Sequence, residues 1–134
     1  MTVLDTSGVV DLLTEGPAAP MVGEMLAAER ELAAPDVLVF ETLATIRRNA
    51  LKGSLPPARA AAAVEDMAEM PVHLFPSLPL RFRAWELREN LSTADALFVS
   101  LAERLGEPLA TKDRSLTKAL SSLGLVSVIA LPSG

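Results

Sequence analysis

The chain has 134 residues, of which 50% are hydrophobic, and 17 acidic side chains against 12 Lys and Arg give it a net charge of −5. This length predicts one domain, residues 1–134, with one core, and the composition favours a mainly parallel sheet covered on both faces. The acidic balance argues against broad electrostatic attraction to nucleic acid, and the absence of cysteine excludes disulfides and thiolate metal sites.

No segment of the sequence predicts a membrane span. The most apolar candidate, residues 119–134, is interrupted by serine, glycine and proline before it reaches the roughly 18 residues that a span needs. No basic region precedes the first apolar residues, so a secretory signal is not expected either. We therefore expect a cytoplasmic protein that does not associate with membranes.

Short apolar strands alternate with helices in the first half of the chain. Thr2–Asp5 predicts a buried strand that ends in an acid, and the apolar residues after it predict a helix to near Gly16. The other strands and helices expected here are Leu32–Ala34, Pro71–Pro76, Pro20–Glu31, Asp36–Lys52 and Pro57–Met70. In the helix that begins at Asp36, the apolar row is expected to be Val39, Leu43, Ile46 and Ala50. Glu41 lies off this row.

The stretch from Leu91 to Asp113 organises the second half of the chain. Apolar residues recur at helical spacing between Ser92, which can cap the helix, and Gly106, which can end it. A short strand follows and ends in Thr-Lys-Asp, so Asp113 lies just past a strand. The elements expected around this helix are Leu80–Asn90, Pro108–Ala110, Asp113–Leu123 and Val126–Leu131. The alternation implies right-handed crossovers, a mainly parallel sheet and the α/β fold class.

Four acids are candidates for a shared site, although each also has a structural explanation. Asp5 and Asp113 can be N-caps, Asp95 fits a capping box that begins at Ser92, and Glu41 suits the first turn of a helix. Capping alone does not require these acids to converge. In a parallel sheet, however, the carboxyl ends of the strands and the following helix starts share one edge.

Carboxylates brought together in this way repel each other unless a cation lies between them. Oxygen ligands suit a hard ion such as Mg²⁺ or Mn²⁺. Such an ion activates water and stabilises the charge of a phosphodiester during displacement. The chemistry that the four acids suggest is therefore metal-dependent hydrolysis.

The motifs that carry these acids resemble those of the PIN domain, and most closely those of the VapC ribonuclease toxins. They are Val3-Leu4-Asp5-Thr6-Ser7, Glu41 in a helix that ends Ile46-Arg47-Arg48, Ala94-Asp95-Ala96-Leu97-Phe98, and Thr111-Lys112-Asp113. The resemblance runs from the first strand to the last. It implies a three-layer α/β/α fold, RNA cleavage with Mg²⁺ or Mn²⁺, a homodimer, and inhibition by a VapB antitoxin.

The resemblance also assigns the site residues. Asp5, Glu41, Asp95 and Asp113 match the acidic metal and catalytic site of the family, and Thr6, Ser7 and Thr111 match its hydroxyl positions. The family often carries tyrosines where this chain has Ala94 and Phe98, which leaves the acids unaffected. The apolar excess of the helices leaves room for a homodimer face and an antitoxin groove. Trp85 is expected in the core or at an interface.

Basic residues flank the last acid. Lys112 and Arg114 are the expected contacts to the RNA backbone because they are neighbours of Asp113. A solvated helical face is the alternative explanation of such residues.

Two other functions remain open at this point. The first is a PIN-like module that binds RNA or protein without cleaving, which metal titration would distinguish. The second is a phosphoacceptor signalling domain, but such domains usually carry an acidic pair after the first strand and a Lys near the last one. Here Asp5 stands alone and the last strand has no Lys.

Overall fold

Five short strands form the centre of the fold, and every neighbouring pair of strands runs parallel. The computed structural model describes residues 1–134. The strands are β1 (Thr2–Leu4), β2 (Leu32–Pro35), β3 (Val72–Phe75), β4 (Leu109–Thr111) and β5 (Val128–Ala130). Their order in the sheet is β3-β2-β1-β4-β5, which places the first strand at the centre.

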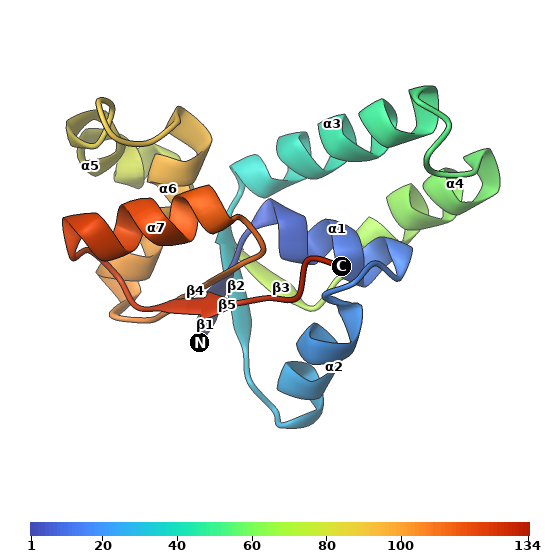
Figure 1. Cartoon of the computed structure of the whole chain (residues 1–134), viewed down its shortest axis with the longest axis horizontal. Coiled ribbons are helices and arrows are strands. Elements are labelled where there is room, and N and C mark those ends of the chain that lie inside the picture. The colour runs from blue at the N-terminus through green and yellow to red at the C-terminus, as the bar shows by residue number, and fades with distance from the viewer.

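Helices cover both faces of this sheet, as the α/β fold class predicted. They are α1 (Thr6–Thr14), α2 (Ala19–Ala27), α3 (Val37–Leu51), α4 (Pro57–Asp66), α5 (Arg81–Glu86), α6 (Thr93–Leu105) and α7 (Arg114–Leu123). In Figure 1, α1 to α4 lie on one side of the sheet and α5 to α7 on the other. The chain crosses to β2 and β3 through the first group and to β4 and β5 through the second. None of these helices has the length and apolar character to cross a bilayer.

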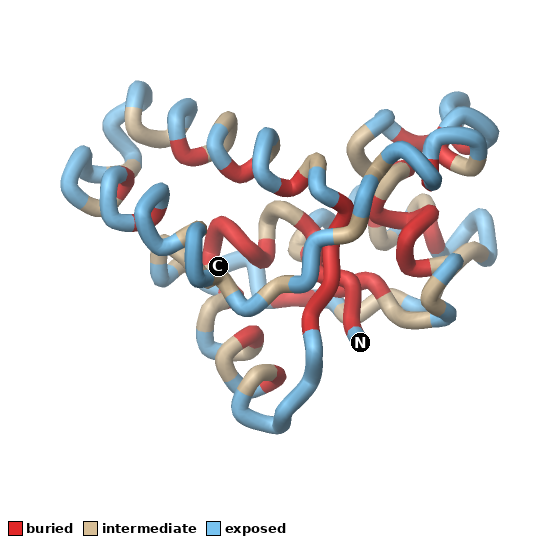
Figure 2. Tube along the Cα trace, turned by 180° about the vertical axis from the view of Figure 1, so that it is seen from behind, coloured by how far each residue is buried: buried red, intermediate tan, exposed pale blue.

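The core lies between the two helical layers. Val3, Leu4, Leu109 and Ala110 on the two central strands are fully buried, and Phe98 of α6 packs into the same cluster. Figure 2 shows the buried stretches in red toward the middle of the molecule, with exposed turns outside them. The edge strand β3 is more open, since none of its four residues is buried. The buried centre therefore consists of β2, β1 and β4, and the last two of these strands lead into Asp5 and Asp113.

Three of the predicted helices are shorter than expected. The helix expected over Pro20–Glu31 ends at Ala27, because the chain turns through Glu29 at a φ of 60°. The helix expected to reach Met70 ends at Asp66 and continues as the 3₁₀ turn Met67–Glu69. The helix expected over Leu80–Asn90 is a 3₁₀ turn, Leu78–Leu80, followed by the short α5. Leu80, Ala84, Leu87 and Leu91, which recur at helical spacing, are nevertheless all buried.

The buried face of α3 differs from the predicted one. Its buried residues are Leu38, Thr42 and Ile46, whereas Val39 and Leu43 are 37% and 42% exposed. The sequence places a polar residue, Thr42, at the centre of the inward row, so the neighbouring apolar row was the more obvious choice. The core position predicted as one option for Trp85 is also wrong, because this side chain is 66% exposed on α5.

Candidate active site

Asp5 is the buried centre of the candidate site. It follows β1 at the carboxyl edge of the sheet, where its backbone N–H donates to the carbonyl of Ala110 on β4 at 3.1 Å. The residue is only 7% exposed. One of its carboxylate oxygens accepts hydrogen bonds from the Ser7 hydroxyl at 2.6 Å and the Gly8 N–H at 3.2 Å. The Thr111 hydroxyl donates to the other carboxylate oxygen. Both oxygens of Asp5 are thus fixed by the protein.

Asp113 lies two residues after the Thr111 that binds Asp5. Its backbone N–H donates to the Thr111 hydroxyl at 3.0 Å, and its side chain caps α7 by accepting from the Leu116 N–H at 3.0 Å. Unlike Asp5, Asp113 is exposed. One threonine therefore connects the two acids that the sequence placed at strand ends.

Glu41 and Asp95 reach the same edge from the starts of two helices. Glu41 on α3 accepts from the Thr6 hydroxyl at 2.8 Å, which ties α3 to the start of α1. Asp95 on α6 donates its backbone N–H to the Ser92 hydroxyl at 3.2 Å, the bond expected of a capping box. Both acids are partly buried. Glu41, Asp95 and Asp113 are called the rim acids below, since each is more exposed than Asp5.

The carboxylates are close enough to perturb one another's charge. Burial raises the pKa of Asp5, and the nearby Asp113 raises it further against the lowering effect of its hydrogen bonds. Burial also raises the pKa of Asp95, with further increases from Asp113, Asp5 and Glu41. The charges of all three other acids thus act on Asp95, so the site concentrates negative charge.

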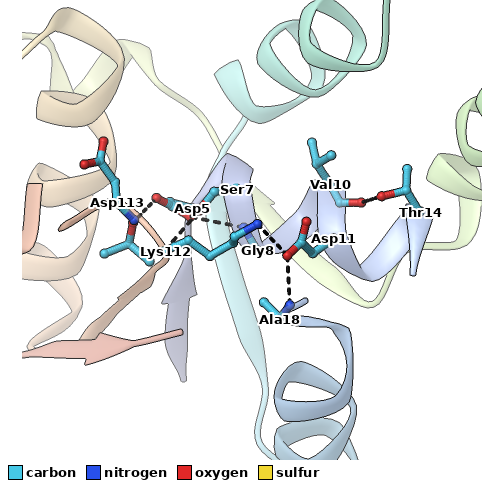
Figure 3. A network of polar contacts seen from close by, with 10 residues as sticks. Asp5, Ser7, Gly8, Val10, Asp11, Thr14, Ala18, Lys112 and Asp113 are labelled. Carbon is cyan, nitrogen blue, oxygen red and sulfur yellow. Dashed lines mark hydrogen bonds and ion pairs between the residues drawn. The ribbon is translucent and has the colours of Figure 1, made fainter. Parts of the chain in front are cut away.

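Lys112, predicted as a contact to the RNA backbone, forms an ion pair within the chain. Its ammonium group pairs with Asp11 of α1 at 2.7 Å, and Asp11 also accepts from the Ala18 N–H at 2.8 Å. The Lys112 N–H donates to Ser7 at 3.2 Å. Figure 3 shows the Lys112 chain reaching across α1 to Asp11, while Asp113 points to the other side. This ion pair holds the β4–α7 turn against α1.

Sequence comparison assigns the chain to a known family. The PIN domain family matches residues 2–119. "Ribonuclease VapC12" of Mycobacterium tuberculosis is 33% identical over 119 residues, 89% of this chain and 92% of the relative. "Ribonuclease VapC9" of the same organism is 36% identical over 118 residues, 87% and 89% of the two chains. The chain belongs to the VapC family. The resemblance stated from the four acidic motifs is therefore confirmed.

Solved structures of VapC and related toxins share the fold. The Mycobacterium tuberculosis VapC20 toxin, described as cleaving the sarcin-ricin loop, has a TM-score of 0.69 at 20% identity and covers 96% of this chain and 98% of its own. A toxin–antitoxin complex from Klebsiella pneumoniae has a TM-score of 0.70 at 18% identity, with 100% of each chain covered. At these identities the match concerns the fold alone.

The donor set in this VapC-family site suits a hard divalent cation. All four candidate ligands offer carboxylate oxygens. Burial is the main reason why the pKa values of Asp5 and Asp95 are raised, and the neighbouring carboxylates add a smaller increase that a cation would oppose. No three His, Asp or Glu side chains lie close enough together to form a closed metal cluster. The four carboxylates share one edge of the sheet but are not arranged as a ready-made metal cluster.

Asp11 is the residue that the sequence reasoning missed. It lies inside the apolar run Val9-Val10-Asp11-Leu12-Leu13 and is 7% exposed. A lone acid within an apolar helix face was a usable signal, because a buried carboxylate needs a partner. The sequence did not indicate that this partner is Lys112, 101 residues further along the chain by their numbering.

Proposed function

We propose that this chain is a divalent-metal-dependent endoribonuclease and the toxin of a VapB–VapC pair. One observation carries the proposal: the buried, hydrogen-bonded Asp5 lies within electrostatic reach of Asp113, and Asp95 senses Asp5, Asp113 and Glu41. Family membership supports RNA as the substrate, since curated relatives at 33% and 36% identity carry the name ribonuclease.

We assign Asp5, Asp95, Asp113 and Glu41 as the residues that would hold Mg²⁺ or Mn²⁺, directly or through water. A bound ion of this kind lowers the pKa of water and stabilises negative charge on phosphate oxygens. Asp5 supplies the fixed ligand, because its orientation is already set by donors on both oxygens. The rim acids complete the site from three separate elements.

The hydroxyl residues position the acids, and in this way they position the substrate indirectly. Ser7 and Thr111 orient Asp5, and Thr6 orients Glu41. Arg114 has no intramolecular ion pair and is exposed beside Asp113, so it remains a candidate contact to the RNA backbone. Lys112 fixes the turn that carries Asp113 through Asp11, and we assign it a positioning role.

The proposal is tested by RNA cleavage with and without chelator, using Asp5→Asn. Asparagine caps a helix about as well as aspartate, so this variant should retain α1 while losing the carboxylate. We expect cleavage to require Mg²⁺ or Mn²⁺ and to fall at least about 100-fold in the variant, since even residues that only support metal ligands cost 10- to 100-fold.

Asp36→Asn is the matched control. Asp36 is an exposed acid that accepts from Ser77 outside the site, so this variant should cleave as the wild type does. Cleavage that survives both chelator and Asp5→Asn would refute the metal-dependent mechanism. A folded protein that binds no Mn²⁺ and cleaves nothing would favour the non-catalytic binding module.

We further propose a homodimer and a VapB-type antitoxin as partners. Large apolar side chains are exposed on α3 and around α5, which supports apolar contact surfaces. They include Phe40, Leu78, Phe82 and Trp85, each at least 66% exposed. Related structures are described as a VapBC2 complex of Rickettsia felis on promoter DNA and as a toxin–antitoxin complex. Co-expression with a small protein encoded beside this gene should yield a stable complex in which RNA cleavage is blocked.

A further inference from the structure

A basic hollow lies between α7 and residues 130–133, close to the proposed active site. It has a volume of about 520 Å³, and Thr111 and Lys112 are among its lining residues. Thr111 is the residue that donates to Asp5. The hollow and the candidate metal site therefore share this threonine.

The charge of this hollow is opposite to that of the whole molecule. Three of its lining residues are cationic, Lys112, Arg114 and Lys118, and none is acidic, although the chain carries five more acids than Lys and Arg. Lys112 is neutralised by Asp11, but neither Arg114 nor Lys118 has an ion-pair partner. Both are exposed. Two cations are thus free to bind an anion here.

Hydroxyl groups line the same hollow. The Thr117 hydroxyl donates a hydrogen bond to the backbone carbonyl of Asp113 at 3.0 Å. Ser121, Ser122 and Ser133 also line the hollow. On a helix, positions 114, 118 and 121 share a face because they are separated by four and three residues. Arg, Lys and Ser are the residue types that contact phosphate oxygens and set the register of a nucleic acid strand.

We propose that this hollow is a subsite for backbone phosphates of the RNA strand, next to the phosphate that is cleaved. The inference rests on the proposed function, because it takes Asp5 and Asp113, the two acids that hydrogen-bond to Thr111, as part of the cleavage site. Arg114 and Lys118 bind phosphate by charge, and the serine hydroxyls add neutral hydrogen bonds. The subsite explains how an acidic protein holds a polyanion, since the attraction is confined to one face of α7.

The test measures binding instead of cleavage, so that it can fail independently of the nuclease assignment. A fluorescein-labelled single-stranded RNA of mixed sequence is titrated with the full chain in EDTA over a range of NaCl concentrations. Arg114→Gln/Lys118→Gln should lower the slope of log K against log salt by about 1.4, because each phosphate contact of a single strand contributes about 0.7. The affinity near 0.1 M salt should fall on the order of 10-fold.

Arg30→Gln/Lys52→Gln is the matched control. It also removes two exposed cations that have no ion-pair partner, from the connection after α2 and from the end of α3, so both variants have a net charge of −5 − 2 = −7. Its slope should remain that of the wild type. Ser121→Ala/Ser122→Ala should weaken binding about fivefold with an unchanged slope, because neutral hydrogen bonds release no counterions.

Equal loss of slope in the charge variant and its control would overturn the subsite, as would a wild type that binds no RNA. An unchanged RNA slope with weaker binding of the antitoxin would also overturn it and would assign the hollow to an acidic protein segment. Binding that behaves as expected in a protein that cleaves nothing with Mn²⁺ would keep the subsite and refute the nuclease.

Discussion

Asp5 and the rim acids are held in different ways, although they share one edge of the sheet. Asp5 is buried and accepts three hydrogen bonds, from Ser7, Gly8 and Thr111. The rim acids are more exposed, and each is placed by the start of its own helix. Glu41 and Asp113 accept one side-chain hydrogen bond each from neighbouring groups.

This difference separates a preformed part of the site from an adjustable part. Asp5 keeps its orientation whether or not a cation is bound, because its donors belong to the folded chain. The rim acids can close on a cation at little cost, because only a cap or one hydroxyl contact restrains them. Capping and metal binding are therefore compatible roles, and Asp113 has the geometry for both.

The largest expected effect comes from breaking the ion pair that holds the β4–α7 turn, with the rim acid Asp113, against α1. Asp11→Ala leaves the Lys112 ammonium without its partner and the Ala18 N–H without its acceptor. Breaking a largely buried ion pair in this way should lower the free energy of unfolding by about 3 kcal/mol. Urea denaturation measures this change. Asp11→Asn, which can still accept from Ala18, should lose less, and equal unfolding midpoints for Asp11→Ala and wild type would contradict the structural role of the pair.

The next effect distinguishes the fixed ligand from a rim ligand. Thr111→Val removes the donor to Asp5 while conserving shape, and Mn²⁺ affinity should fall about 10- to 100-fold. Thr6→Val removes the corresponding donor to Glu41 and should cost less, because Glu41 is a rim acid. Isothermal titration calorimetry with Mn²⁺ measures the affinity of both variants. A larger loss in Thr6→Val would reverse the assignment of fixed and adjustable parts.

A rise in pH should have opposite effects on the stability of the metal-free protein and on its affinity for a divalent ion. The pKa values of Asp5 and Asp95 are raised in the fold, so their contribution to stability is fully present below the unfolded pKa and is lost as pH rises through the folded value. A divalent ion requires the deprotonated form, so its affinity should rise over that same interval. Melting curves at pH 5 and 7.5 should show a larger Mn²⁺-induced increase in Tm at pH 7.5.

The smallest effect is expected at Asp95 and changes sign with metal. Without metal, Asp95→Asn removes a negative charge that burial and three neighbouring acids disfavour. Tm should therefore rise slightly, and the free energy of unfolding should increase by less than about 1 kcal/mol. With Mn²⁺ the wild type should gain stability and the variant should gain less. Scanning calorimetry with and without Mn²⁺ measures both, and a variant that gains as much as the wild type would remove Asp95 from the metal ligands.

The fold was largely predictable because its signals are local. Apolar strands followed by capped helices were sufficient for the α/β class, and the limits Ser92, Gly106 and Gly124 are those observed for α6 and α7. The acids at the sheet edge were predictable for a related reason, since parallel strands fix the side on which Asp5 and Asp113 emerge.

What could not be predicted depends on contacts between distant residues. The buried row of α3 contains Thr42, and only packing against other helices shows that this polar residue faces inward. Lys112 was expected at the substrate because it neighbours Asp113, yet its long side chain reaches Asp11. Flexible cations have many possible partners, and their position in the sequence does not identify the one that the fold selects.

The bond from Thr111 to Asp5 joins residues 106 positions apart. During translation, Asp5 leaves the ribosome early, but its second oxygen has no donor until β4 has been synthesised and has inserted beside β1. An unfinished polypeptide thus lacks the completed carboxylate site. Assembly of the site is delayed to the end of synthesis, so products truncated before β4 should lack the assembled site.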